Sequence, residues 1–289
     1  MMQDSKNTHQ GEKANRAEAG ARTSAPPGPE TVASSSARPL TARSVIASTL
    51  LGMTPPRLPT LLLVRSGELF GISAGTTRVA LSRMVAAGEL EADGAGYRLA
   101  GHLLNRQARQ SASRSAVVRP WDGEWTMAVV VDGRRSAVER GELRNAMRVL
   151  RLAETREGVW LRPDNLAPGS APEAEAVVTA QCHRFTAQPV DEAAPALAGR
   201  LWDLEGWAAR THQLQAEMRG LVGRLEAGDT DALAPGFVTS AAVLRHFLAD
   251  PLLPSELVTD SWPGQHVRTD YDRYDYAFKT VWRDWFRDQ

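Results

Sequence analysis

The feature that most constrains the fold is a helical pattern followed directly by a tight two-strand pattern. In GTTRVALSRMVAAGEL, residues 75–90, apolar side chains recur at helical spacing around Leu81, and Gly88 marks the end. The next stretch, ELEADGAGYRLAG, alternates apolar and polar residues on both sides of an Asp-Gly turn, which is typical of a β-hairpin. Two helical patterns, TARSVIASTLLG and LPTLLLVRSGELFGI, come earlier. Three helices and a hairpin predict a winged helix-turn-helix.

The outward face of the third helix, residues 74–87, carries no acidic side chain. At about 100° per residue, the face opposite Leu81 collects Thr76, Val79, Ser82, Arg83 and Ala86. A slim face with hydroxyl and guanidinium donors can enter the major groove of DNA, where such donors reach base edges and phosphates. We therefore predict that this is a recognition helix for double-stranded DNA.

Five side chains of this helix and its N-terminal cap are predicted DNA contacts. Arg78, one turn into the helix, is placed to bond a guanine edge through two nitrogens. Ser73 and Thr76 lie near the N-terminus and can bind phosphate or base, and Ser82 adds a hydroxyl further along. Arg83 is predicted to bind phosphate.

The hairpin and the charge balance point to the same anionic partner. Tyr97 and Arg98 are predicted to press on the adjacent DNA backbone or minor groove. Residues 41–115 hold nine arginines against four acids, whereas residues 116–289 hold 20 bases against 26 acids. The alternative is a winged helix that binds another protein, because this fold also serves protein contacts.

The rest of the chain predicts an α+β domain followed by helices. WDGEWTMAVVVDG and GVWLRPD predict strands on either side of a helix in RRSAVERGELRNAMRVLRLA, and a further strand is expected in AVVTAQCHRFTA. This order suggests a ferredoxin-like domain in residues 116–190. Residues 191–289 predict a helical domain for effector binding and dimerisation, and the polar, Pro-rich residues 1–40 predict a disordered tail. A basic helical connector completes the winged-helix domain, residues 41–115.

Catalytic patterns are scarce. The six histidines have neither the HxH nor the HExxH spacing of zinc sites, and there is no phosphate-binding GxxxxGK[ST] motif. We therefore expect no catalytic residues, no metal and no cofactor, and a protein that is not an enzyme. The enzyme alternative is a metal-dependent nuclease centred on Asp132, at the end of the first strand of the α+β domain.

A small-molecule pocket is the other site that the sequence suggests. Trp121 and Trp160 could line an apolar pocket for an aromatic effector, and Arg119 and Arg162 beside them suit the phosphates of a coenzyme A ester. The single cysteine, Cys182, excludes an internal disulfide and predicts a reducing, cytoplasmic setting. The chain has no apolar run of about 18 residues and no secretory signal pattern, so we expect no membrane contact.

The order of these motifs resembles that of the PaaX-type transcriptional regulators, named for the repressor of phenylacetic acid degradation. Six stretches carry the resemblance, in the order TTRVALSRMVAAGEL, YRLAG, WDGEWTMAVV, GVWLRPDNL, LWDLEGW and DPLLPSELVTDSWPG. They span nearly everything after the N-terminal tail.

The resemblance implies an N-terminal winged helix, a central ferredoxin-like domain similar to the small endonucleases of CRISPR adaptation, and a helical C-terminal domain. It also implies a homodimer that represses a catabolic operon and leaves its operator DNA when an aryl-acetyl coenzyme A ester binds. The helix is similar to that of fatty-acid-responsive GntR-type regulators as well, in which the arginine equivalent to Arg78 reads DNA.

Overall fold

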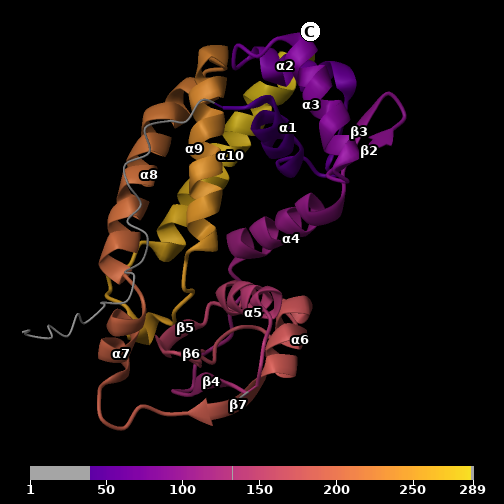
Figure 1. The fold of residues 1–289 in the computed structure, drawn as a ribbon. Helices are drawn as coiled ribbons and strands as arrows, with labels where there is room; N and C mark the ends of the chain where they lie inside the picture. The colour runs from indigo at the N-terminus through magenta and orange to yellow at the C-terminus, as the bar shows by residue number, and fades with distance from the viewer. Residues whose placement is uncertain (1–39, 132, 288–289) are drawn as a thin grey trace, which may run out of the picture. The chain divides into compact units, whose positions relative to one another are not determined.

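The computed structural model describes residues 40–131 and 133–287 of the chain (Figure 1). The predicted tail, residues 1–40, falls outside the described residues except for Leu40, and so does Asp132. Helices and two small sheets follow one another along the chain. Within the described ranges, none of the helices is both long enough and apolar enough to cross a membrane.

The first group of elements contains the three predicted helices and the predicted hairpin. The helices are α1 (Ala42–Leu51), α2 (Thr60–Glu68) and α3 (Ala74–Ala86). The hairpin strands are β2 (Leu90–Asp93) and β3 (Gly96–Leu99). Apolar side chains from all of these elements form one core, which includes Ile46, Leu63, Leu81, Leu90 and Leu99.

The hairpin also carries a strand that the sequence patterns did not predict. β1 (Arg57–Pro59) pairs antiparallel with β3, so the sheet order is β1-β3-β2. The turn occupies residues 94–95, where Gly94 has a φ of 60°. A Cβ atom on Gly96 would clash with the carbonyl of Leu58, so β1 and β3 can approach only because residue 96 is glycine.

The second group is a four-stranded antiparallel sheet with the order β5-β6-β4-β7. Its strands are β4 (Trp125–Val130), β5 (Ala153–Arg156), β6 (Val159–Pro163) and β7 (Cys182–Ala187). Side chains alternate across the sheet. Ala128 and Trp160 face α5 (Ala137–Val149) and α6 (Pro172–Gln181), whereas Trp125 and Leu161 pack on α7 (Ala194–Leu201).

The prediction of a strand throughout AVVTAQCHRFTA is wrong for its first half. Residues 176–181 belong to α6, and the strand begins only at Cys182. Val177, Val178 and Thr179 favour a strand, but Pro172 starts a helix and Glu173 and Glu175 stabilise its first turn. Val178 then packs in the core, so burial outweighs the local propensity.

The third group consists of three long helices. They are α8 (Leu204–Glu226), α9 (Leu233–Leu248) and α10 (Gly264–Arg287), with short 3₁₀ turns at Thr230–Ala232 and Ser255–Leu257. Their common core is rich in aromatic side chains, including Trp207, Phe247, Tyr271, Tyr274 and Trp282. The predicted helical character of this region is confirmed.

A single helix, α4 (Gly101–Ser115), leads out of the first group and packs against α9. The predicted connector is therefore helical, as expected. Near its C-terminal end, Arg114 donates hydrogen bonds to Asp272 at 2.6 Å and to Asp275 at 2.7 Å, both on α10. The Arg114 guanidinium also lies 5.0 Å from the ring centre of Tyr271.

Two further arginines reach the same end of α4. Arg151, in the turn between α5 and β5, donates to the Ser113 hydroxyl at 2.8 Å and to the Leu248 carbonyl. Arg268 of α10 donates to the Ser113 carbonyl at 3.2 Å and pairs at 2.8 Å with Asp250, which is buried. We call this set the arginine junction: Arg114, Arg151 and Arg268. It joins α4 to both the four-stranded sheet domain and the long helices.

The packing of His246 on α9 predicts an acid-sensitive step in unfolding. Its ring stacks on Trp207 at 4.5 Å, and its Nε2 lies 2.7 Å from the Thr211 hydroxyl. Burial lowers the pKa of His246 from 6.5 to about 4, and the nearby Arg210 and Arg268 act in the same direction. Asp250 opposes the shift.

We expect the Tm to fall as the pH decreases from about 6.5 to about 4, because the unfolded chain takes up a proton that folded His246 resists. The contribution is about 1–2 kcal/mol once the partial exposure of the ring is allowed for. His246→Gln should flatten this part of the Tm profile, and the exposed His266→Gln should not. Parallel pH profiles for the wild type and His246→Gln would contradict the assignment.

Candidate nucleic-acid interface

The N-terminus of α3 is fixed by its cap. The Ser73 hydroxyl accepts a hydrogen bond from the Thr76 amide at 3.2 Å and lies 2.9 Å from the Thr76 hydroxyl. One turn later, the Thr77 hydroxyl donates to the Ser73 carbonyl at 3.2 Å, and Thr77 is fully buried. Ser73 and Thr76 are both exposed, so the two predicted contact residues form one polar pair at the start of the helix.

The exposed side of α3 has the character that the sequence predicted. Only Thr77, Leu81 and Met84 of this helix are buried. Arg78, Val79, Ser82, Arg83 and Ala86 are exposed, and the helix contains no acidic residue. Val85 lies one turn after Leu81, where helical spacing predicts a buried side chain, but it is 38% exposed because the core ends at Leu81 and Met84 on that flank.

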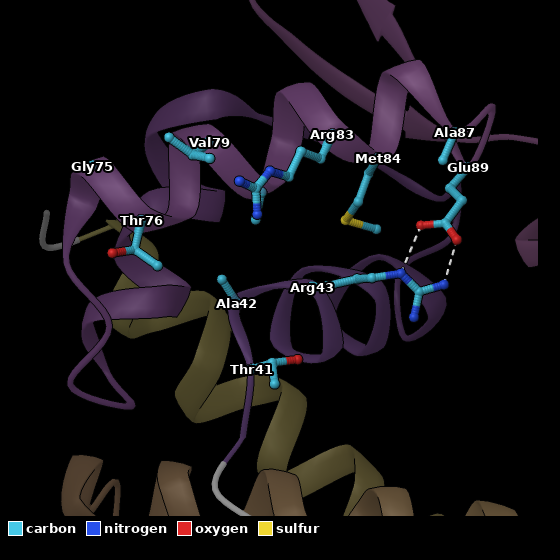
Figure 2. A pocket seen from close by; sticks show the side chains of 11 residues that line it. Thr41, Ala42, Arg43, Gly75, Thr76, Val79, Arg83, Met84, Ala87 and Glu89 are labelled. Carbon is cyan, nitrogen blue, oxygen red and sulfur yellow. Dashed lines mark hydrogen bonds and ion pairs between the residues drawn. The ribbon is translucent and has the colours of Figure 1, made fainter.

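A hollow of about 730 Å³ lies between α3 and the start of α1 (Figure 2). Small side chains such as Ala42, Gly75 and Ala80 keep it open, and Thr76 and Arg83 line it. Figure 2 shows the Arg83 guanidinium directed from α3 toward Ala42. Backbone and small side chains at this place allow a rigid polyanion to approach both helices closely.

The two arginines of α3 lie on different flanks of the exposed face. Arg83 and Thr76 belong to the hollow, whereas Arg78 is not among its lining residues. The Ser82 hydroxyl donates a hydrogen bond to the Arg78 carbonyl at 3.2 Å. Its oxygen can still accept a hydrogen bond, but its only hydrogen is already used. Among the described residues, neither Arg78 nor Arg83 has a carboxylate within ion-pair distance. Both guanidinium groups are therefore available to an anion.

An ion pair at the far end of the hollow was not predicted. Arg43 of α1 donates to both carboxylate oxygens of Glu89, and the bond from its Nε is 2.9 Å long. Glu89 is 6% exposed and lies between α3 and β2, with His102 Nε2 at 3.6 Å. The hydrogen bond from Arg43 is the largest of the effects that hold the pKa of Glu89 below its usual 4.5. The pair joins residues 46 positions apart, so no local pattern reveals it.

The hairpin residues are partly engaged within the fold. Tyr97 packs against the core of the first group, and Arg98 pairs with Glu91 on the neighbouring strand. The carbonyl of Ala95 at the turn accepts bonds from the amide and hydroxyl of Thr60, at 3.0 and 2.9 Å. The hairpin is thus docked on α2, and the Arg98 side chain stays 56% exposed.

The structure does not bring the four predicted effector residues into one pocket. Trp160 packs with α5 and α6, whereas Trp121 belongs to the cluster on the opposite face of the sheet, 6.3 Å from the Trp125 ring. Arg119 pairs with Asp164 at 2.5 Å.

Arg162 has a structural role. It is 3% exposed, and it donates to the carbonyls of Leu150 and Pro163 and to the Asn165 side chain, at 3.0, 2.8 and 2.5 Å. Burial lowers the pKa of Arg162 to about 9. Because each of its three nitrogens already donates to a group of the fold and the side chain is buried, a ligand phosphate would have to displace these bonds.

Asp132 lies outside the described residues, and the described ones hold no cluster of three His, Cys, Asp or Glu side chains suited to a metal ion. Cys182 is buried in the core of the sheet domain, and burial raises the pKa of its thiol.

Comparisons with known proteins cover most of the described chain. Three family models match: "PaaX-like protein" at residues 41–103, "PaaX protein central Cas2-like domain" at 118–197 and "PaaX-like protein C-terminal domain" at 202–287. Among solved structures, the chain is 40% identical to the uncharacterised protein Rv0674 from Mycobacterium tuberculosis, with a TM-score of 0.65. The match covers 84% of this chain and 98% of that one. No curated protein matches the chain significantly.

The Arg43–Glu89 pair yields a stability prediction. Glu89→Gln should lower the free energy of unfolding by about 1–3 kcal/mol at pH 7, because it removes the carboxylate charge and one of the two oxygens that accept from Arg43. The folded-state pKa of Glu89 is depressed, so this contribution is present above about pH 4.5 and is lost as the pH falls through the folded value. Urea unfolding at pH 7 and at lower pH measures both effects.

Glu68→Gln is the control, since Glu68 forms only an exposed pair with Arg65 at 3.0 Å and should change stability by a few tenths of a kcal/mol. Equal stability of the wild type and Glu89→Gln at pH 7 would show that the pair does not hold α1 to the end of α3.

Proposed function

Since the chain belongs to the PaaX family, a family of transcriptional regulators, we propose that it binds double-stranded DNA through a winged helix-turn-helix in residues 41–115. In this proposal α3 is the recognition helix and the β2–β3 hairpin is the wing. The arrangement of α1, α2 and α3 with a three-stranded sheet supports the assignment.

One observation carries the proposal: the exposed face of α3 is free of acids and presents two arginines without carboxylate partners among the described residues. A face of this kind repels no phosphate and leaves its guanidinium donors free. The hollow beside this face is lined by Gly75, Ala80 and Ala42, so a phosphate can approach Arg83 without meeting a large side chain.

The residue roles follow from the two flanks of α3. Arg78 reads a guanine edge in the major groove, and Thr76 with Ser73 bonds a base or phosphate at the N-terminus of the helix. Arg83, which lines the hollow toward α1, contacts phosphate. Ser82, on the same exposed side, donates to phosphate after its hydroxyl has left the Arg78 carbonyl. Tyr97 and Arg98 act from the wing, with Arg98 exchanging Glu91 for the DNA backbone.

The remaining domains complete the proposal. Residues 116–190 form a ferredoxin-like domain, and the strand order β5-β6-β4-β7 with α5 and α6 on one face supports this interpretation. Residues 191–289 form a helical domain through which the protein dimerises. The dimer represses a catabolic operon, and an aryl-acetyl coenzyme A or related acyl-coenzyme A ester releases it from the operator because that ester binds better to the form that does not bind DNA. Membership of the PaaX family supports these assignments.

DNA binding is tested with a labelled duplex that the protein selects from a random pool, measured by fluorescence anisotropy. We expect Arg78→Gln to weaken binding to the selected duplex by about 1–3 kcal/mol and to relax the base preference at one position. Arg83→Gln should weaken binding to selected and random duplexes alike and reduce the salt slope by about one.

Arg148→Gln is the matched control, because Arg148 is exposed on α5 of the central domain and should leave the affinity unchanged. If Arg78→Gln and Arg83→Gln both bind the selected duplex as tightly as Arg148→Gln, α3 is not the DNA-reading helix. If the wild type retains no duplex at low salt, the protein-binding alternative gains support.

A further inference from the structure

A second cavity of about 730 Å³ lies between the first group of elements and the long C-terminal helices. Its walls come from α1 and the segment after it, from α4, and from α9 and α10. This volume lies within the range of small-molecule sites, which hold mostly apolar ligands and a few fixed polar groups. None of the four effector residues predicted from the sequence lines this cavity.

One side of the cavity is an aromatic surface. Phe237 on α9 stacks on Trp282 of α10 with ring centres 5.9 Å apart. Phe278 and Phe286 lie on either side of Trp282, each at 5.3 Å. All four rings line the cavity, so it offers an aromatic or acyl group a large apolar contact area.

The polar side of the cavity has an excess of positive charge. Arg106, Arg114, Lys279 and Arg283 line it, and Asp275 is the only acid among the lining residues. Asp275 already accepts hydrogen bonds from Arg114 at 2.7 Å and from Lys279 at 2.8 Å. The charge of Asp275 is thus balanced by Arg114 and Lys279. The guanidinium groups of Arg106 and Arg283 remain on the same wall without this acid.

Arg106 is the most informative of these cations. It is half-buried on α4, and the described residues place no carboxylate within ion-pair distance of it. Burial lowers its pKa, and the charges of Arg245, Arg109 and Arg43 add to that effect. A half-buried cation surrounded by other cations is stabilised by a bound anion.

Two residues of the cavity lining also carry a buried hydrogen-bonding group without a partner among the described residues. Thr49 and Trp282 both line the cavity and are each 3% exposed. The Thr49 hydroxyl and the Trp282 indole N–H have no hydrogen-bond partner within the described part of the chain. Unpartnered buried donors are costly, so a side-chain rearrangement at this wall that turned either donor toward a ligand oxygen would be favourable.

We propose that this cavity binds an organic anion with an aromatic or acyl body. The apolar body lies against Phe278 and Trp282, and the anionic group lies at Arg106 and Arg283. The inference rests on the proposed function only where it concerns DNA binding. Since α1 packs on α3, a ligand between α1 and α10 changes how α3 is held, and with it the contact of α3 with DNA.

Isothermal titration of the full chain with phenylacetate and, separately, with phenylacetyl coenzyme A tests the site without DNA. We expect saturable binding of one anion per chain by at least one of the two. A free carboxylate is the ligand if phenylacetate binds, and a phosphate-bearing thioester if only the coenzyme A ester binds. Arg106→Gln should weaken binding about tenfold or more.

Two further variants sharpen the test. Ala241→Phe should abolish binding by filling the cavity from α9, whereas Arg109→Gln, on the same helix as Arg106 but outside the cavity, should bind within about twofold of the wild type. The proposal is overturned if the wild type binds neither anion at about 1 mM, or if both Arg106→Gln and Ala241→Phe keep wild-type affinity. Failure of DNA binding would leave these titrations unchanged, so the two proposals fail separately.

Discussion

The arginine junction at the C-terminal end of α4 is the contact on which the arrangement of the three groups of elements depends. Arg114 ties α4 to Asp272 and Asp275 of α10, and Arg151 ties the sheet domain to Ser113 and to the end of α9. Asp275 is buried and would carry an uncompensated charge without its partners. Because α4 is also the direct continuation of the hairpin, the junction fixes the direction in which the first group leaves the rest of the chain.

The junction and the second cavity share residues. Arg114 belongs to both, and Tyr271, which lies under its guanidinium, lines the cavity as well. A ligand there would compete with the contacts that hold α4, while α1 on the opposite wall packs directly on α3. If α4 and α1 can pack around this cavity in two ways, a ligand that binds one of them better shifts the equilibrium toward it. Such a shift would change the position of α3.

Local patterns predicted the elements of the site and missed its long-range contacts. Helical spacing around Leu81 and the Asp-Gly turn placed α3 and the hairpin correctly, because neighbouring residues determine both. The Arg43–Glu89 pair and the aromatic cavity join segments far apart in the chain, and a charge or ring gives no sign of its distant partner. Trp160 and Arg162 illustrate the converse: their residue types suited a ligand, yet burial in the sheet domain engages them.

The most direct measurement is the affinity for the selected duplex with and without saturating phenylacetyl coenzyme A, in the wild type and in Arg151→Gln. Arg151 belongs to the junction but lines neither this cavity nor the hollow beside α3. If the arginine junction couples ligand binding in the cavity to DNA binding at α3, the ligand weakens DNA binding about tenfold in the wild type and less than about twofold in Arg151→Gln. An equal shift in both proteins, or none in the wild type, would contradict this role of the junction.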